Sequence, residues 1–155
     1  MWRTTRSSAM TGDAMSDSPP LPSAEIIFEI PFHDVDSAQV AWHGHYSKYF
    51  ELARCALLDR IDYNYPQMSA SGYFWPVIDM HIRYVAPASF QQKIRVTATL
   101  VEWENRLRID YLIADLTTGK RLTKGHTIQV AVAMDSGDMQ FASPPVLAHK
   151  LGLLP

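Results

Sequence analysis

The stretch FHDVDSAQVAWHGHYSKYFELAR, residues 32–54, places two aspartates and then two histidines immediately before a helical pattern. Apolar residues recur at helical i, i+3, i+4 and i+7 spacing from Tyr46 to Ile61, which predicts a helix of about 16 residues and roughly 24 Å. Leu52 widens its apolar surface, so other elements must wrap around this helix. A smaller set of helical positions is expected to face solvent: Ser47, Lys48, Glu51, Arg54 and Asp59.

Strand-like segments flank this helix on both sides. Residues 25–32 (EIIFEIPF) are short, apolar and rich in Ile and Phe, as buried strands are. Four further segments follow the helix, each with alternating apolar and polar residues that predict one buried face: 73–84, 93–103, 106–116 and 121–134. Their polar connections are typical of antiparallel hairpins. This order predicts an α+β fold, a curved antiparallel sheet of about five strands wrapped around one long helix.

The composition limits the class of function. With 155 residues, 47% apolar and 19% charged, the chain fits a single compact domain over residues 23–155. Residues 1–22 are rich in Ser, Thr and Pro and are predicted to be a disordered arm, in which Met10 or Met15 is the hypothesised start of translation. A net charge of −2 with both signs scattered indicates no nucleic-acid partner, and no apolar run is long enough for a bilayer. The single cysteine, Cys55, excludes an internal disulfide and favours the cytoplasm.

The quoted stretch and the order of elements resemble the hotdog-fold acyl-CoA thioesterases of the 4-hydroxybenzoyl-CoA thioesterase and YbgC type. In that family D-x-D-x-x-G precedes V-x-aromatic-His/Tyr and then Y-x-x-Y/W. The corresponding positions here are Asp34-Val35-Asp36, Val40-Ala41-Trp42-His43, Tyr46 and residues 50–54. A weaker match runs through PVIDMHIRYVAPASF, residues 76–90, and the segment RCALLDRI, residues 54–61, is similar to thioesterase-like proteins of aryl-polyene gene clusters.

The resemblance implies that Asp36 is the catalytic carboxylate and that the backbone N–H of His43 polarises the thioester carbonyl. General chemistry agrees, because an ionised carboxylate acts as nucleophile or as general base, and donors at a helix N-terminus stabilise an oxyanion. The family usually has glycine where this chain has Gln39, so either the loop geometry differs or Gln39 contacts substrate. Gln39 is joined by four further substrate-binding candidates: Trp42, Tyr46, Glu51 and Arg83.

Other interpretations of these residues stay open. Asp36 could be only an Asx-turn residue before a helix, and Asp34 is expected to be mostly structural. The pair His43 and His45 could hold a metal, yet no third ligand follows at a recognisable spacing, so neither metal nor cofactor is predicted. Hotdog dehydratases, which share this plan, pair a histidine with an acid on the helix. Here His43 and Glu51 would lie about 12 Å apart, too far for shared proton transfer unless a partner subunit closes the gap.

The predicted reaction is hydrolysis of an acyl-CoA or acyl-carrier-protein thioester to free acid and thiol. The alternatives are a 3-hydroxyacyl-thioester dehydratase or hydratase, and a non-catalytic acyl-thioester-binding protein. In the family the strand after the helix pairs with its twin, so residues 73–83 are predicted to form a homodimer, or a dimer of dimers, with the aromatic residues 73–75 at the seam, in the acyl pocket or in the core. The phosphates of coenzyme A would need cations, which the sequence does not rank: Arg83, Arg106, Arg108, Lys120, Arg121 and Lys124.

Overall fold

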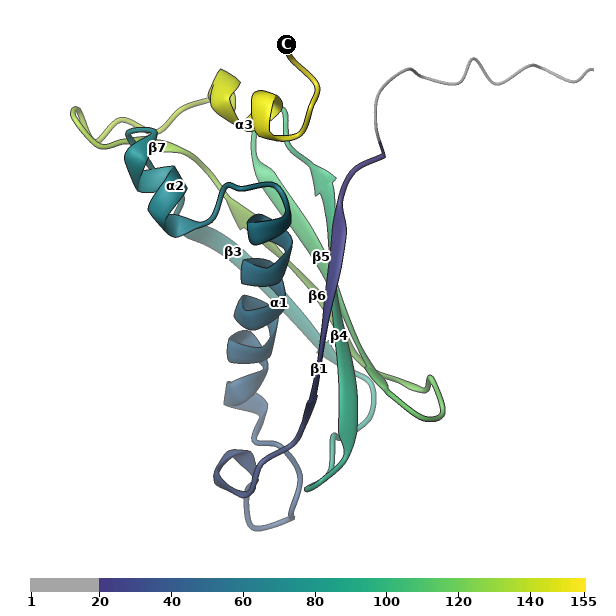
Figure 1. Cartoon of the computed structure of the whole chain (residues 1–155). Helices are drawn as coiled ribbons and strands as arrows, with labels where there is room; N and C mark the ends of the chain where they lie inside the picture. Colours follow the sequence, from purple (N-terminus) through teal and green to yellow (C-terminus); the bar gives the residue numbers. More distant parts are fainter. Residues whose placement is uncertain (1–19) are drawn as a thin grey trace, which may run out of the picture.

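In the computed structural model, which describes residues 20–155, one long helix lies across one face of an antiparallel sheet (Figure 1). The helix is α1 (Tyr46–Arg60), and the five strands are arranged in the order β1-β4-β5-β6-β3. The predicted α+β architecture of five strands and a central helix is therefore observed. The strands of this sheet are β1 (Ser23–Glu29), β3 (Val77–Tyr84), β4 (Lys93–Glu102), β5 (Leu107–Asp115) and β6 (Arg121–Gln129).

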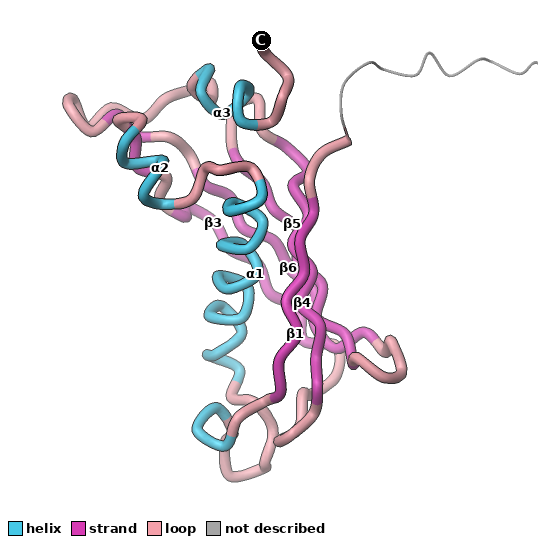
Figure 2. Tube along the Cα trace, viewed as in Figure 1, coloured by secondary structure: helices cyan, strands magenta, loops and turns pink. Residues whose placement is uncertain are grey.

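The N-terminal arm predicted over residues 1–22 lies almost wholly outside the described residues, as do both hypothesised translation starts. At the other end of the described chain, α3 (Pro145–Lys150) lies near the C-terminus (Figure 2). Within residues 20–155, no helix combines the length and the apolar character that crossing a membrane requires.

The apolar face of α1 packs tightly on the middle of the sheet. Phe50 is fully buried and stacks on Tyr111 of β5, with ring centroids 4.4 Å apart and an interplanar angle of 6°. Burying one such aromatic side chain contributes about 1.5–3 kcal/mol. Gly125 of β6 lies opposite Tyr111, and a Cβ at this position would meet the Phe50 ring at 2.8 Å. A glycine is therefore needed where the helix approaches the sheet.

Two predicted strands are each divided between two sheets. Residues 73–84 form β2 (Tyr73–Phe74) and β3, while residues 121–134 form β6 and β7 (Val132–Ala133), and β2 pairs with β7 in a separate two-stranded sheet. Pro76 interrupts the first of these segments because it has no N–H to donate to a ladder.

The strand before the helix ends earlier than predicted. β1 stops at Glu29, and Phe32 lies instead in a short 3-10 helix, η1 (Phe32–Asp34). Pro31 precedes this turn and, lacking an N–H, cannot extend the ladder between β1 and β4.

β3 lacks the buried face that alternation predicts. It is an edge strand of the sheet, and Ile78, Met80 and Tyr84 are each about half exposed in the described chain. The sequence pattern identifies apolar side chains but not the surface that covers them. β1 is the other edge strand of the sheet, and β3 is the edge on which these apolar side chains are exposed.

Two helix positions also differ from expectation. Leu52 is half exposed, whereas Arg54, expected to face solvent, is buried. The Arg54 guanidinium donates to the hydroxyl groups of Tyr65, at 3.0 Å, and Tyr111, at 3.5 Å. Phenolic acceptors can satisfy a buried guanidinium, a pairing that helical periodicity does not reveal.

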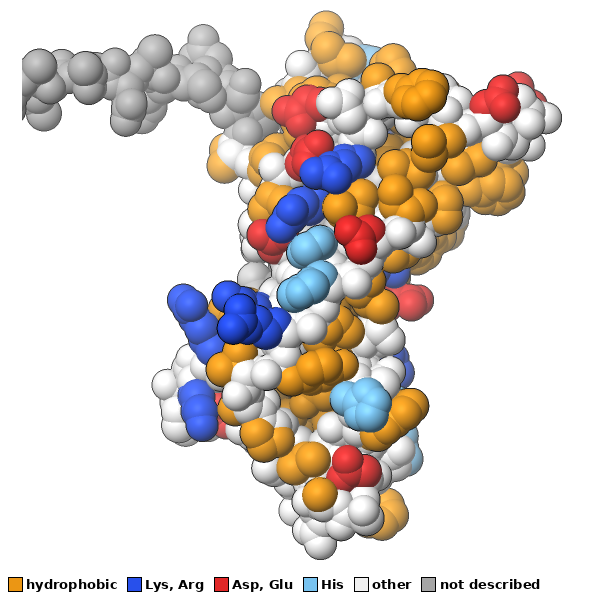
Figure 3. All heavy atoms as spheres, turned by 180° about the vertical axis from the view of Figure 1, so that it is seen from behind, with side chains coloured by type: hydrophobic (Ala, Val, Ile, Leu, Met, Phe, Trp, Pro, Cys, Tyr) orange, Lys and Arg blue, Asp and Glu red, His pale blue; other side chains and the backbone are white. Residues whose placement is uncertain are grey.

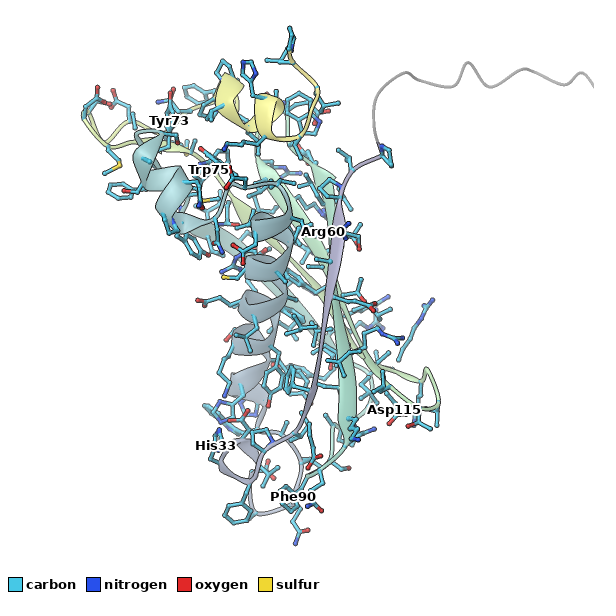
Figure 4. All side chains as sticks on the ribbon, viewed as in Figure 1. His33, Arg60, Tyr73, Trp75, Phe90 and Asp115 are labelled. Carbon is cyan, nitrogen blue, oxygen red and sulfur yellow. The ribbon has the colours of Figure 1, made fainter. Side chains whose placement is uncertain are left out.

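The helix after α1 was not predicted, although its start has a sequence signal. Asn64 and Gln67 form a capping box at the start of α2 (Tyr65–Ala70), in which the Asn64 side chain accepts from the backbone N–H of Tyr65 and the Gln67 side chain accepts from that of Asn64. Behind α2, Trp75 is buried and donates to the Tyr63 hydroxyl at 3.2 Å. Trp75 is therefore part of the hydrophobic core. Tyr73 and Trp75 lie at the opposite end of α1 from His33 and Phe90 (Figure 4).

Candidate active site

A cleft of about 340 Å³ lies at the N-terminal end of α1, and three predicted site residues line it together: Asp36, His43 and Tyr46. They come from the loop after η1, the turn before α1 and the first residue of α1. The remaining walls are apolar or aromatic: Val40, Ala41, Tyr84, Val85, Ala86 and Pro87. The sequence motif and the end of β3 thus meet in one concave site.

The loop that carries Asp36 is a tight turn. The Asp36 N–H donates to the Val40 carbonyl at 3.0 Å, and the Gln39 N–H donates to the Asp36 carbonyl at 2.9 Å. Asp36 Oδ1 accepts from the Ala38 N–H at 2.8 Å, which is an Asx turn. Within residues 20–155 the other carboxylate oxygen accepts no hydrogen bond, and the side chain is exposed. The Asx turn therefore orients the carboxylate and leaves one oxygen free for chemistry.

Gln39 adopts a backbone conformation that favours glycine. Its φ is +61°, in the left-handed region, and its carbonyl accepts from the Phe90 N–H at 3.0 Å. For a residue with a side chain this conformation costs about 1 kcal/mol. The loop thus keeps a geometry that glycine would adopt, and the exposed Gln39 does not line the cleft.

The chain enters α1 through a second 3-10 turn, η2 (His43–His45). Within residues 20–155 the N–H groups of His43 and Gly44 donate no hydrogen bond, as expected for the first turn of a helix. The Trp42 ring lies against Gly44, where any Cβ would overlap it. Its centroid is 5.0 Å from that of the His43 ring and 5.3 Å from that of His45. Trp42 therefore packs on the turn rather than lining the cleft.

Tyr84 is a site residue to which the sequence assigned no role. Its hydroxyl donates to the His43 carbonyl at 2.6 Å, and its ring meets Tyr46 edge-on with centroids 5.0 Å apart. Burial raises the pKa of both Tyr46 and Tyr84, so both phenols stay protonated at neutral pH. The sequence signal that could have identified Tyr84 is its position in the segment 76–90, which weakly resembles the thioesterase family.

Asp34 attaches the same loop to α1 through its buried carboxylate. It is 1% exposed, and its carboxylate accepts from Lys48 Nζ and from the Tyr49 hydroxyl, each at 2.7 Å. Burial alone would raise the pKa of Asp34, but the hydrogen bonds from Lys48 and Tyr49 and the charge of Lys48 outweigh it and hold that pKa below its usual value. Burial and the neighbouring Asp34 raise the pKa of Tyr49. These contacts agree with a structural role for Asp34.

The remaining sequence candidates lie outside the cleft. Glu51 is exposed on α1 and Arg83 is exposed on β3, where it lines a neighbouring hollow instead. The structure thus does not bring Glu51 into one site with His43, as the dehydratase alternative would need within one chain. Among residues 20–155, no three His, Cys, Asp or Glu side chains gather in a group that could hold a metal ion.

Known proteins resemble this chain in sequence and in fold. Residues 30–151 match the family described as the thioesterase-like superfamily. The relative sll0410 of Synechocystis sp., whose name assigns it provisionally to the esterases, is 27% identical over 128 residues, covering 82% of this chain and 77% of that protein. YneP of Bacillus subtilis, named provisionally as an acyl-CoA thioesterase, is 27% identical over 75 residues, covering 48% of this chain and 51% of YneP.

A solved structure supports the fold. Slr0204, a 1,4-dihydroxy-2-naphthoyl-CoA thioesterase from Synechocystis, superimposes with a TM-score of 0.75 at 18% identity, covering 86% of this chain and 98% of Slr0204. The hotdog fold and the thioester-hydrolase class that the resemblance implied are confirmed. The match over residues 30–151 spans well over half of the chain, which therefore belongs to the thioesterase-like superfamily.

Proposed function

We propose that this protein hydrolyses acyl-CoA thioesters to the free acid and coenzyme A. The observation that carries the proposal is the cleft, which is lined both by the exposed Asp36 and by His43 of the 3-10 turn η2 that leads into α1. Membership of a thioesterase-like family supports thioester chemistry. The names of YneP and Slr0204 favour coenzyme A as the thiol that leaves.

The chemistry follows from these groups. Asp36 attacks the carbonyl carbon directly, or removes a proton from a water molecule that attacks it, and a C–O bond forms as the carbonyl oxygen becomes an oxyanion. The free N–H of His43 and the positive end of the α1 dipole stabilise that oxyanion. The C–S bond then breaks and the sulfur leaves as the thiol after taking up a proton. With direct attack, water hydrolyses the resulting anhydride in a second step.

Tyr84 and Tyr46 give the cleft an aromatic wall. Tyr84 also fixes the His43 carbonyl through its hydroxyl, which holds the entry to α1 in place. With Val85 and Pro87 beside these rings, the cleft favours an apolar or aromatic acyl group.

We further infer that two copies pair through the free edge of β3. The half-exposed Ile78 and Met80 on β3, and Leu52 on α1, would become buried by such pairing. Met80→Asp is expected to convert the dimer to a monomer, which light scattering of the eluting protein would detect. A wild-type protein that elutes as a monomer would refute the pairing. A cytoplasmic location is inferred from the lone Cys55 thiol and is tested by fractionating native cells.

The function is tested by following free-thiol release from a panel of aliphatic and aromatic acyl-CoAs. Asp36→Asn is expected to lower kcat by about 10²–10⁴-fold, the usual contribution of a general acid or base. Glu29→Gln is the matched control, because it removes a negative charge from an exposed carboxylate at the end of β1, outside the cleft. Equal rates in wild type and Asp36→Asn would refute the role of Asp36, and absence of release from every acyl-CoA would refute the reaction.

A further inference from the structure

A hollow of about 540 Å³ adjoins the cleft at the end of β3, and we name it the basic hollow. Tyr84 and Val85 line both the cleft and the basic hollow, so the two are continuous at these residues. Its cations are Arg83 of β3 and Arg121 and Lys124 of β6. Figure 3, which views the molecule from behind, shows a cluster of Lys and Arg side chains beside two adjacent histidines.

Two of these cations are placed directly against each other. Arg83 is the antiparallel partner of Lys124 in the ladder between β3 and β6. The preceding pair, Ile82 and Gly125, belongs to the row beneath Phe50 of α1, so Arg83 and Lys124 project from the opposite face of the sheet. Like charges directly opposite one another destabilise a sheet. The fold therefore keeps an unfavourable pair of like charges in the basic hollow, and an anionic ligand would relieve their repulsion.

Within the described chain, no acidic side chain pairs with these three cations; Asp110 lines an adjoining hollow with all three, but there it pairs with Arg108. The basic hollow has no Asp or Glu in its walls, and within residues 20–155 Arg83, Arg121 and Lys124 form no ion pair. By contrast, Arg106 lies 2.9 Å from Glu102, and Arg108 lies 3.1 Å from Asp110. The structure thus ranks the cations that the sequence left unranked.

We propose that the basic hollow binds the phosphates at the nucleotide end of coenzyme A, and so selects acyl-CoA over acyl-carrier protein; this rests on the proposed function. Each guanidinium group, of Arg83 and of Arg121, can donate two parallel hydrogen bonds to a phosphate, and Lys124 adds a third positive charge. With the thioester at Asp36 and the phosphates at Arg83, the pantetheine arm passes Tyr84 and Val85, which border both sites. A carrier protein presents only one phosphodiester, so it gains less from three cations.

The test compares one acyl group carried on coenzyme A and on pantetheine, which has no phosphate. Wild type is expected to have a kcat/KM at least tenfold higher for acyl-CoA. In Arg83→Gln/Lys124→Gln this preference falls towards one through a higher KM for acyl-CoA, with kcat little changed. Lys93→Gln is the matched control, because Lys93 is exposed and forms no ion pair within residues 20–155, yet lies outside the cleft and the basic hollow.

Two further measurements, the melting temperature of the double variant and its affinity for coenzyme A, allow the kinetic result to be interpreted. Because the double variant removes a like-charge pair, it is expected to melt no lower than wild type. Retention of the acyl-CoA preference in the double variant would overturn the proposal, as would a wild type with no preference. Faster hydrolysis of acyl-carrier protein than of acyl-CoA would also overturn it and assign the cations to the carrier. If no thioester is hydrolysed, the proposed function fails, and calorimetry with coenzyme A then tests the basic hollow separately. An affinity for coenzyme A that is tenfold weaker in the double variant than in wild type supports phosphate binding in the hollow. Equal affinity in the two proteins, or no binding to wild type, overturns it.

Discussion

Asp34 and Asp36 carry the same side chain, two residues apart, yet they occupy opposite environments. Asp34 is buried against α1, where one carboxylate oxygen accepts a hydrogen bond from Lys48 and the other from Tyr49. Asp36 is exposed in the cleft, with one oxygen held by the Asx turn and the other open. The 3-10 turn η1 ends at Asp34, so the chain changes direction between the two residues. The donors around each carboxylate, more than its place in the motif, thus decide whether it is held in the fold or left available for the proposed chemistry.

The largest effect expected from this comparison is on the chemistry of Asp36. Asp36→Asn should lose about 10²–10⁴-fold in kcat while its free energy of unfolding stays within about 0.5 kcal/mol of wild type, because the side chain is exposed and the amide oxygen can still accept from Ala38. Thiol release and urea denaturation on the same preparation measure both quantities. A stability loss above 1 kcal/mol would show that Asp36, too, is mainly structural.

Asp34→Asn should show the reverse pattern. Loss of the charge-assisted hydrogen bonds from Lys48 and Tyr49 is expected to lower the free energy of unfolding by about 1.5–3 kcal/mol. The lower end is favoured because Lys48 is 46% exposed and can be hydrated again. Urea denaturation measures the loss, and kcat should fall less than tenfold. If kcat falls as far as in Asp36→Asn without loss of stability, the division of roles is wrong.

The pH dependence of stability sharpens the same contrast. Since the pKa of Asp34 is lowered in the folded chain, its ionisation stabilises the fold above its unfolded pKa, near 4, and this stabilisation is lost as pH falls through the folded value. The difference in unfolding free energy between wild type and Asp34→Asn should thus be constant from pH 7 to about 5 and shrink below about 4. Denaturation series at pH 7, 5 and 3 test this, and a gap of equal size at pH 3 and pH 7 would contradict it.

The smallest effect concerns Gln39, which follows Asp36 in the same loop and donates its N–H to the Asp36 carbonyl. Gln39→Gly removes the cost of a left-handed backbone but adds entropy to the unfolded chain, so unfolding free energy should change by about 0 to +1 kcal/mol. KM should stay within twofold of wild type, because Gln39 does not line the cleft. Thermal melting and steady-state kinetics decide between the two interpretations of Gln39. A KM raised several-fold with unchanged stability would make it a substrate contact.

Helical periodicity and the short sequence motif predicted the features that depend on residues close together in the chain. Periodicity placed α1 within a residue of its observed ends, and the motif pointed to Asp36 and His43, which the fold brings to one cleft. Contacts between distant strands were beyond such patterns. The opposition of Arg83 and Lys124 depends on the register of two strands 41 positions apart. The burial of Arg54 depends on hydroxyl groups from α2 and β5, which helical spacing does not encode.

Gly125, in the middle of β6, determines how closely β6 can approach its neighbours β3 and α1. A Cβ at position 125 would lie 2.2 Å from the backbone oxygen of His81 on β3 and 2.8 Å from the Phe50 ring of α1, so both elements approach this position as closely as they do because it carries only a hydrogen atom. A larger residue there would force β3 or α1 to move, and these two elements carry the tyrosines of the cleft, Tyr84 and Tyr46. Gly125 does not line the cleft, yet it limits the spacing of the two elements whose tyrosines form the aromatic wall of the cleft.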